Sequence, residues 1–306
     1  MGYFIVRRVI SSVGVLWGVT TVVFLLLRVV PGDPAETILA GSGASQAEIA
    51  QVRQQLGLDD SLLVQYGRYL LSLLQGDLGR SLFSHRPVTL TIAEQLPATL
   101  QLAAAALLVA VLVGLGLGIL SALRTGTWID HAGMGIAVLG VSVPVFWSGL
   151  LLIWIFSLTL GWLPATGAGG LSHLVLPAMV LGMVAAGPLA RLVRASLLQA
   201  LRADYITMAR AKGLSESAVV SRHALRNAMV PAIALIGLQA GFLLAGTVVT
   251  EAVFARPGLG RLVVEAILWK DLPVVQGVVL LIAAIYVILN LAVDLASPAL
   301  DPRLRP

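Results

Sequence analysis

Residues 200–231 read ALRADYITMARAKGLSESAVVSRHALRNAMVP, a polar and basic stretch in a chain that is otherwise mostly apolar. Hydrophobic segments long enough to cross a bilayer lie on both sides of it. A loop rich in Lys and Arg between two spans is typical of the cytoplasmic side of a membrane protein. The stretch therefore predicts a cytoplasmic loop of a polytopic protein, and its docking partner should indicate the function.

The composition of the whole chain supports this class. Hydrophobic residues make up 58% of the 306 residues, charged residues 11%, and the mean hydropathy is +0.95. Soluble domains carry about 25% charged residues. The chain has no cysteine, which excludes disulfides, thiolate metal sites and iron–sulfur clusters. Its pI of 10.1 fits basic loops facing anionic lipid better than nucleic-acid binding.

Six hydrophobic segments match the roughly 20 residues that a membrane span requires. They cover residues 9–27, 98–123, 133–160, 174–193, 230–250 and 273–296. No small-residue cleavage site follows the first, so we expect a retained helix and not a signal peptide. The predicted fold is all-α, with a first helix in 1–30, an extracytoplasmic segment in 31–97, a five-helix core in 98–296 that contains a cytoplasmic loop at 195–230, and a tail in 297–306.

The distribution of charge predicts the orientation. With the N-terminus inside, twelve of the 20 Lys and Arg residues lie on the cytoplasmic side, against five of the 15 acidic residues. This excess of positive charge predicts that both termini are cytoplasmic. The pairs Gly114/Gly118 and Gly237/Gly241 have the spacing that lets two membrane helices approach closely, so we expect them at helix contacts.

Two regions outside the spans have structure of their own. The outer segment carries apolar residues at helical spacing between Gln65 and Leu74, and either covers the outer mouth, docks a partner or is a structural cap. In the basic loop, residues 203–211 can form a helix with Tyr205, Met208 and Ala209 on one side. Gly213 ends that helix, and Ser215 caps a second helix that Pro231 should stop at residue 230. This helix pair suits either docking of a soluble protein or adsorption to anionic lipid.

Several blocks of the sequence resemble the permease subunits of ATP-binding-cassette importers, and more narrowly the dipeptide, oligopeptide and nickel branch. The first block is DYITMARAKGLS from Asp204, followed by Arg222-His223-Ala224-Leu225-Arg226-Asn227 and Pro231. The others, in order, are Pro31-Gly32-Asp33-Pro34, Leu56-Gly57-Leu58-Asp59, Val64-Gln65-Tyr66, Gly76-Asp77-Leu78-Gly79, Pro97-Ala98-Thr99-Leu100, Pro257-Gly258-Leu259-Gly260 and Leu300-Asp301-Pro302-Arg303. The resemblance covers nearly the whole chain, and the long outer segment is similar to that of the branch's first permease subunit.

The resemblance implies the type I importer fold and a coupling helix seated on a separate ATPase. The residues implied to make this contact are Asp204, Tyr205, Thr207, Met208, Ala209, Arg210, Ala211, Lys212, Gly213, Leu214 and Ser215. The wider family has Glu-Ala-Ala where this chain has Thr207-Met208-Ala209, so the acidic contact is absent. The implied partners are a homologous second permease, two ATPase subunits that bind ATP and Mg, an extracytoplasmic binding protein and the lipid of the bacterial inner membrane.

We expect a transport subunit without catalysis of its own. The sequence has no G-x-x-x-x-G-K-[ST] loop for ATP, no catalytic grouping and no paired acidic or His residues of a proton relay in its spans. Its four His residues are scattered in loops, so neither a metal nor a bound cofactor is expected. Candidates for a pathway or gate are Gln239, Glu251 and Pro144, where Glu251 is either an outer gate or an interfacial cap; Pro144, Pro177 and Pro188 are candidates for helix breaks. The expected cargo is di- or oligopeptides, with a nickel or other metal chelate as the alternative and a stand-alone secondary transporter as the rival class.

Overall fold

The computed structural model describes residues 2–29, 33–39 and 45–300, and these residues form helices, turns and one isolated bridge. The α-helices are α1 (Gly2–Val29), α2 (Pro34–Ile38), α3 (Gln46–Gln55), α4 (Leu62–Leu74), α5 (Val88–Leu123), α6 (Trp128–Ser142), α7 (Val145–Leu152), α8 (Ser172–Leu201), α9 (Asp204–Ala211), α10 (Glu216–Ala218), α11 (Leu225–Val253), α12 (Leu259–Leu268) and α13 (Leu272–Leu300). Two π-helical turns, η1 (Ile153–Thr159) and η2 (Val219–Ala224), continue α7 and precede α11. The predicted all-α fold is confirmed. Pro31, Gly32 and the predicted tail from residue 301 lie outside the described residues.

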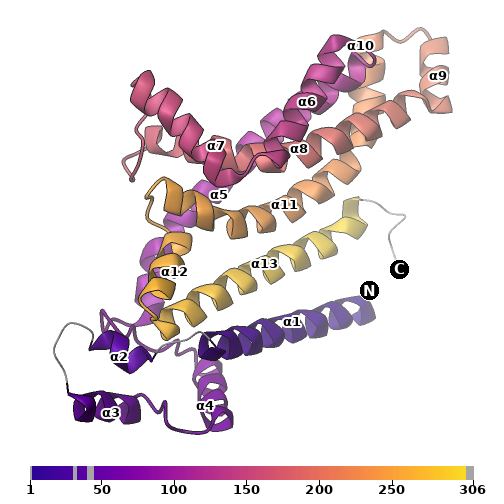
Figure 1. Ribbon diagram of the computed structural model, residues 1–306. Coiled ribbons are helices and arrows are strands. Elements are labelled where there is room, and N and C mark those ends of the chain that lie inside the picture. The colour runs from indigo at the N-terminus through magenta and orange to yellow at the C-terminus, as the bar shows by residue number, and fades with distance from the viewer. Residues whose placement is uncertain (1, 30–32, 40–44, 301–306) are drawn as a thin grey trace.

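Five of the described helices are long and apolar enough to cross a membrane, and the number is six if a pair of helices bent against each other counts as one span. The five are Val6–Val29, Val88–Leu123, Ser172–Leu201, Glu216–Val253 and Leu272–Leu295. The pair consists of Trp128–Ser142 and Val145–Thr159. The start of α1, the end of α13 and helix α9 all lie on one side of the molecule, at the right in Figure 1, as the predicted topology requires.

The span predicted at 133–160 is broken near its middle. Helices α6 and α7 meet at an angle of 108°, and Pro144 stands between them. Proline lacks the amide hydrogen that would continue the helix and its ring clashes with the preceding turn. The predicted break at Pro144 is therefore present, whereas α8 runs without interruption through both Pro177 and Pro188.

The prediction that Pro231 stops the second helix of the basic loop is wrong. Residues Glu216–Val253 form one continuous helical span, with the π-helical turn η2 a few residues before the proline. Prolines are tolerated in membrane helices because neighbouring helices and local π adjustments satisfy the freed backbone groups. The short cytoplasmic helix and the fifth span are consequently one element.

Helices α5 and α8 make the central contact of the fold, and glycines permit their close approach. A Cβ atom at Gly118 would lie 2.7 Å from the carbonyl oxygen of Ala190 and 2.8 Å from the Cβ of Val193. Gly114 faces Leu189 in the same way. Gly237 and Gly241 of α11 face side chains of α13, so both predicted glycine seams are confirmed as helix contacts.

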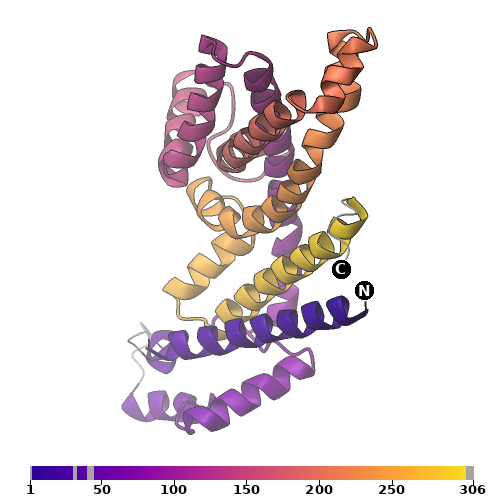
Figure 2. The same ribbon diagram turned by 90° about the vertical axis from the view of Figure 1, so that its right-hand side faces the viewer.

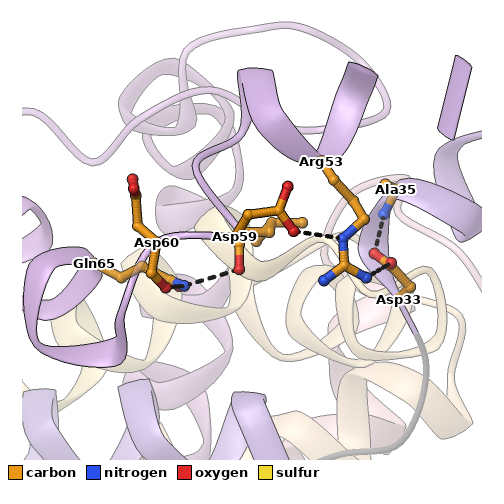
Figure 3. Close-up of polar contacts among 7 residues, drawn as sticks. Asp33, Ala35, Arg53, Asp59, Asp60 and Gln65 are labelled. Carbon is orange, nitrogen blue, oxygen red and sulfur yellow. Dashed lines mark hydrogen bonds and ion pairs between the residues drawn. The ribbon is translucent and has the colours of Figure 1, made fainter. Parts of the chain in front are cut away.

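The described parts of the outer segment, residues 33–39 and 45–87, form helices and turns near the outer ends of α1 and α13. Arg53 of α3 pairs with Asp33 at 2.5 Å and with Asp59 at 3.0 Å, which joins three parts of the segment (Figure 3). Helix α4 lies beside α1, and α13 lies on another side of α1 (Figure 2). Helix α5, which follows, begins at Val88, ten residues before the predicted start of the second span at residue 98.

Candidate functional site

The cytoplasmic loop is anchored by a small apolar core at the inner end of the molecule. Ile206 and Ala209 of α9 are buried in a cluster with Leu197, Ala200, Val219, Ala224, Ala228 and Ala122. These partners come from α8, η2, α11 and α5. Helix α9 is therefore fixed to four other elements, and a force applied to α9 reaches the spans directly.

Gly213 closes α9 in the left-handed conformation that the sequence predicts, with φ +80°. Its amide donates to the carbonyl of Arg210 at 2.9 Å, and the amide of Leu214 donates to the carbonyl of Ala209 at 3.4 Å. This pair of bonds is the Schellman arrangement, which favours glycine because it has no Cβ. Nothing lies within 4 Å of a Cβ placed at Gly213, so the backbone conformation alone calls for glycine there.

An ion pair across the turn fixes the next residues. Arg210 donates to Glu216 through Nε at 2.7 Å and Nη2 at 3.2 Å, and this pairing raises the pKa of the Arg210 guanidinium. Ser215 occupies the cap position before Glu216, but its hydroxyl contacts Ser217 and makes no cap bond. The predicted cap is correct in position and wrong in its hydrogen bond.

The outward face of this loop combines apolar and basic side chains. Tyr205, Met208 and Leu214 are exposed there, next to the exposed Lys212. The Tyr205 hydroxyl accepts a hydrogen bond from Asn227 of α11 at 3.0 Å. The predicted helix with Tyr205, Met208 and Ala209 on one side is present; of the implied contact residues only Ala209 is buried, so it lies at the inner edge of that side while Tyr205 and Met208 are exposed. An exposed apolar face on a rigid, basic loop is suited to binding a folded protein.

Behind the loop, a charged pair joins α6 to α8. Asp130 is buried and accepts hydrogen bonds from Arg194 Nε and Nη2, both at 2.7 Å, and from the amide of Gly126 at 3.1 Å. A bidentate pair of this kind holds both position and orientation. The turn between α5 and α6 is thus attached to the helix that leads into the loop.

At the outer end, Glu251 in the last turn of α11 is fully buried. Its carboxylate accepts hydrogen bonds from the Thr99 hydroxyl at 2.7 Å and from the amides of Gly260 at 2.7 Å and Arg261 at 3.3 Å. The amide of Leu259 donates to Thr99 Oγ1 at 2.8 Å. Glu251 therefore caps the start of α12 and joins α12 to α5 and α11, and of its two predicted roles this geometry fits the interfacial cap.

The backbone around this outer clasp, defined as Glu251, Thr99 and the start of α12, leaves no spare room. A side chain at Gly258 would overlap the Glu251 carboxylate, and one at Gly260 would overlap the backbone of Val248. Arg256 is buried beside it and donates to Gln101 at 2.8 Å. The pKa of the Arg256 guanidinium is lower than usual, because burial lowers it by more than the nearby Glu251 carboxylate raises it.

A second clasp holds the outer segment to the other end of α12. Asp271 is buried and accepts hydrogen bonds from the Ser81 hydroxyl at 2.5 Å and the Leu82 amide at 3.1 Å. The rings of Phe83 and Trp269 also meet, with centroids 5.4 Å apart. The outer segment, α12 and α11 are consequently joined in one continuous series of contacts.

The remaining candidates are dispersed. Gln239 is buried within α11, Pro144 is exposed at the bend, and Glu251 belongs to the outer clasp. In the part of the chain that the structure describes, no three His, Cys, Asp or Glu residues gather as a metal site. Sequence reasoning missed Asp130, Arg194 and Asp271. The available signal was an acidic residue close to the end of a span, but a single sequence does not show which distant residue such an acid pairs with.

Comparison with known proteins gives consistent matches. Residues 114–306 match the family described as the inner membrane component of binding-protein-dependent transport systems, and residues 1–103 match the N-terminal family of the same membrane component. The chain is 45% identical over 302 residues to a glutathione transport system permease protein of Salmonella paratyphi A, covering 99% of this chain and 98% of the relative. It is 39% identical over 327 residues to a dipeptide transport system permease protein of Alkalihalophilus pseudofirmus, covering 98% of each.

The fold has relatives among solved structures. An inward-facing structure of the MetNI methionine ABC transporter superposes with a TM-score of 0.59 at 20% identity, over 69% of this chain and 97% of that one. An amino acid ABC transporter superposes with a TM-score of 0.53 at 18% identity, over 71% and 95%. At this identity the likeness concerns the fold, and it supports the fold class predicted from the sequence.

Proposed function

This chain belongs to the family of inner membrane components of binding-protein-dependent transport systems, and from that membership we propose that it is the permease subunit through which short peptides enter the cell. As an importer permease of this family, it is a transport subunit of the inner membrane. The observation that carries the proposal is the rigid loop of α9 and Gly213, exposed at the inner end and anchored to four spanning or adjoining elements.

Peptides are the proposed cargo because of the two full-length relatives. One transports glutathione, which is a tripeptide, and the other transports dipeptides, by the names they carry. We therefore prefer short peptides to the alternative of a nickel chelate. Cargo would arrive from an extracytoplasmic binding protein at the end of the molecule that carries α12 and the outer segment.

Energy would come from separate ATPase subunits that hold ATP and Mg²⁺. Their closure would displace α9, and the buried contacts of Ile206 and Ala209 would pass that displacement to α8 and α11. Helix α11 would carry it outward to Glu251, and so to α12. Two ATPase subunits and a homologous second permease complete the proposed assembly, with the pathway between the two permeases and alternately open to either side.

Replacement of Gly213 by Asp tests this role. The variant must adopt a left-handed conformation with a side chain and adds a negative charge on the docking face, so we expect ATP-driven peptide uptake and stimulated ATPase activity to be lost while membrane insertion is normal. The matched control is Gly170→Asp, because Gly170 also has a positive φ (+92°) and open space around it but lies in the outer loop before α8.

Uptake is measured in vesicles that contain the whole transporter, with labelled dipeptide or glutathione and loaded binding protein. Gly170→Asp should retain uptake. Normal uptake in Gly213→Asp would refute the proposed coupling role, and uptake without ATP by this chain alone would favour the stand-alone transporter.

A further inference from the structure

Helix α4 presents an apolar face that no other described part of the chain covers. Leu63, Leu71 and Leu74 are 83%, 60% and 86% exposed. At helical spacing these three residues lie on one side of α4. The only charged residue of α4, Arg68, lies on a different side, is exposed and pairs with Asp60. Helix α4 is therefore amphipathic, and its bare face is the apolar one.

Polar and aromatic contacts fix the orientation of α4 against α1. The side-chain oxygen of Gln65 accepts from Arg28 Nε at 3.1 Å and Nη2 at 3.0 Å. Its amide nitrogen donates to the carbonyls of Leu58 at 3.1 Å and Asp60 at 2.8 Å, and Figure 3 shows Gln65 beside Asp60. The Phe24 ring packs on Tyr66 and Tyr69 with centroids 5.0 and 5.7 Å apart. With this side held, α4 cannot turn its leucines toward α1.

The depth of this contact places α4 in the membrane. The Tyr66 hydroxyl is hydrogen-bonded to Thr21 at 2.6 Å. Thr21 lies eight residues before Val29, the end of the first span, which is about 12 Å at the rise of an α-helix. Half of the hydrocarbon layer is about 15 Å thick. A helix that touches α1 at this level lies beside the outer leaflet.

The surface around α4 is also apolar. At the same level α1 exposes Val22, Leu25, Leu26 and Val29, and a spanning helix presents such residues to lipid. The leucines of α4 extend this lipid-facing surface sideways. An amphipathic helix with an apolar face and a basic residue on its polar side is the type that lies in the membrane interface.

We propose that α4 is an interfacial helix of the outer leaflet, with Leu63, Leu71 and Leu74 in the lipid acyl chains and Arg68 at the headgroups. It holds the outer segment on the membrane surface next to α1. The rest of the segment, from Gly79 to Pro87, is fastened to α12 and α13 through Ser81 and Asp271. The segment is thus held at both ends, once by lipid and once by protein.

The chain has no cysteine, so single cysteines can report the surroundings of each position. Leu63→Cys, Leu71→Cys and Leu74→Cys are labelled one at a time with a polarity-sensitive fluorophore, in the whole transporter reconstituted into phosphatidylethanolamine and phosphatidylglycerol vesicles. The matched control is Arg68→Cys on the polar side of the same helix. A second set of vesicles contains lipid with a spin-label quencher near the headgroup.

We expect the labels at the three leucine positions to emit at shorter wavelength than the Arg68 label and to lose more emission to the lipid quencher. Emission at the wavelength of the Arg68 label would overturn the proposal, because the leucine face would then lie in water. Short-wavelength emission that the lipid quencher leaves unchanged would overturn it too, since a protein partner would cover the face. Each leucine is highly exposed and replaced separately, so folding of the helix does not depend on it.

Discussion

Replacement of Glu251 by Ala should release α12 from the ends of α5 and α11. The change leaves the Thr99 hydroxyl and the amides of Gly260 and Arg261 without the acceptor that they share. A buried donor deprived of its partner costs about 1–3 kcal/mol. Since the Arg261 bond is long at 3.3 Å, we count two full losses and expect about 2–6 kcal/mol of local destabilisation.

Hydrogen exchange of the amides in α12 measures this directly. Each 1.4 kcal/mol corresponds to a tenfold change in an equilibrium, so a loss of about 3 kcal/mol predicts exchange of Gly260 and Arg261 that is on the order of 100-fold faster. Glu251→Gln keeps one acceptor oxygen and the side-chain volume. It should fall between Glu251→Ala and the unchanged chain.

The matched control is Glu265→Ala on the same helix. Glu265 makes an exposed i,i+4 pair with Arg261, and such pairs contribute about 0.3–0.5 kcal/mol. Exchange in this variant should change little. If α12 in Glu251→Ala exchanges no faster than in Glu265→Ala, the reasoning about the outer clasp is wrong.

Three further changes test other contacts. Gly118→Ala should lower the melting temperature of the detergent-solubilised protein, because overpacking against Ala190 destabilises the fold by about 1–3 kcal/mol. Gly116→Ala on the same helix should have no such effect, since its Cβ meets no atom within 4 Å. Arg194→Lys should also lower the melting temperature, because Lys cannot make the bidentate contact with Asp130. The control is Arg191→Lys, since Arg191 lies on the exposed side of α8. Equal melting temperatures of the two variants would contradict the role of the Asp130–Arg194 pair. Asp271→Ala should destabilise the attachment of residues 80–87 by about 1–3 kcal/mol and so increase proteolysis there. The control is Asp77→Ala, and the same cleavage pattern in both variants would argue against a second clasp.

The sequence predicts the class of this fold well because spans are marked by length and hydropathy, which are local properties. Five of the six predicted spans match continuous helices, with shifts at their ends. The wrong predictions concern positions where the environment of a proline, water or membrane, determines whether the helix continues. Pro231 would end a helix in water, but α11 passes through it within the membrane. Pro97 likewise lies inside α5, which begins at Val88, ten residues before the predicted start of the second span.

The candidate site was predictable in part. The left-handed turn at Gly213 follows from one residue and its neighbours, and the structure has it. The partners of Glu251 in the outer clasp were not predictable, although they lie in quoted blocks of the sequence: Thr99 in PATL and Leu259 with Gly260 in PGLG. Leu259 and Thr99, which are hydrogen-bonded, are 160 residues apart in the sequence, and no periodicity indicates that their two blocks meet. Similarly, Gln65 of VQY reaches Leu58 of LGLD.

The bend between α6 and α7 has a consequence for what surrounds it. It lies at the end of the fifteen residues of α6, about 22 Å along the helix from Trp128 at the rise of an α-helix. Pro144 has no amide hydrogen, so the α-helical hydrogen bond from residue 144 to the carbonyl of Gly140 is missing at this bend. Irregular backbone at such depth persists only against protein or beside water. The bent pair α6 and α7 therefore needs protein or water beside Pro144, because lipid chains alone cannot surround such a break.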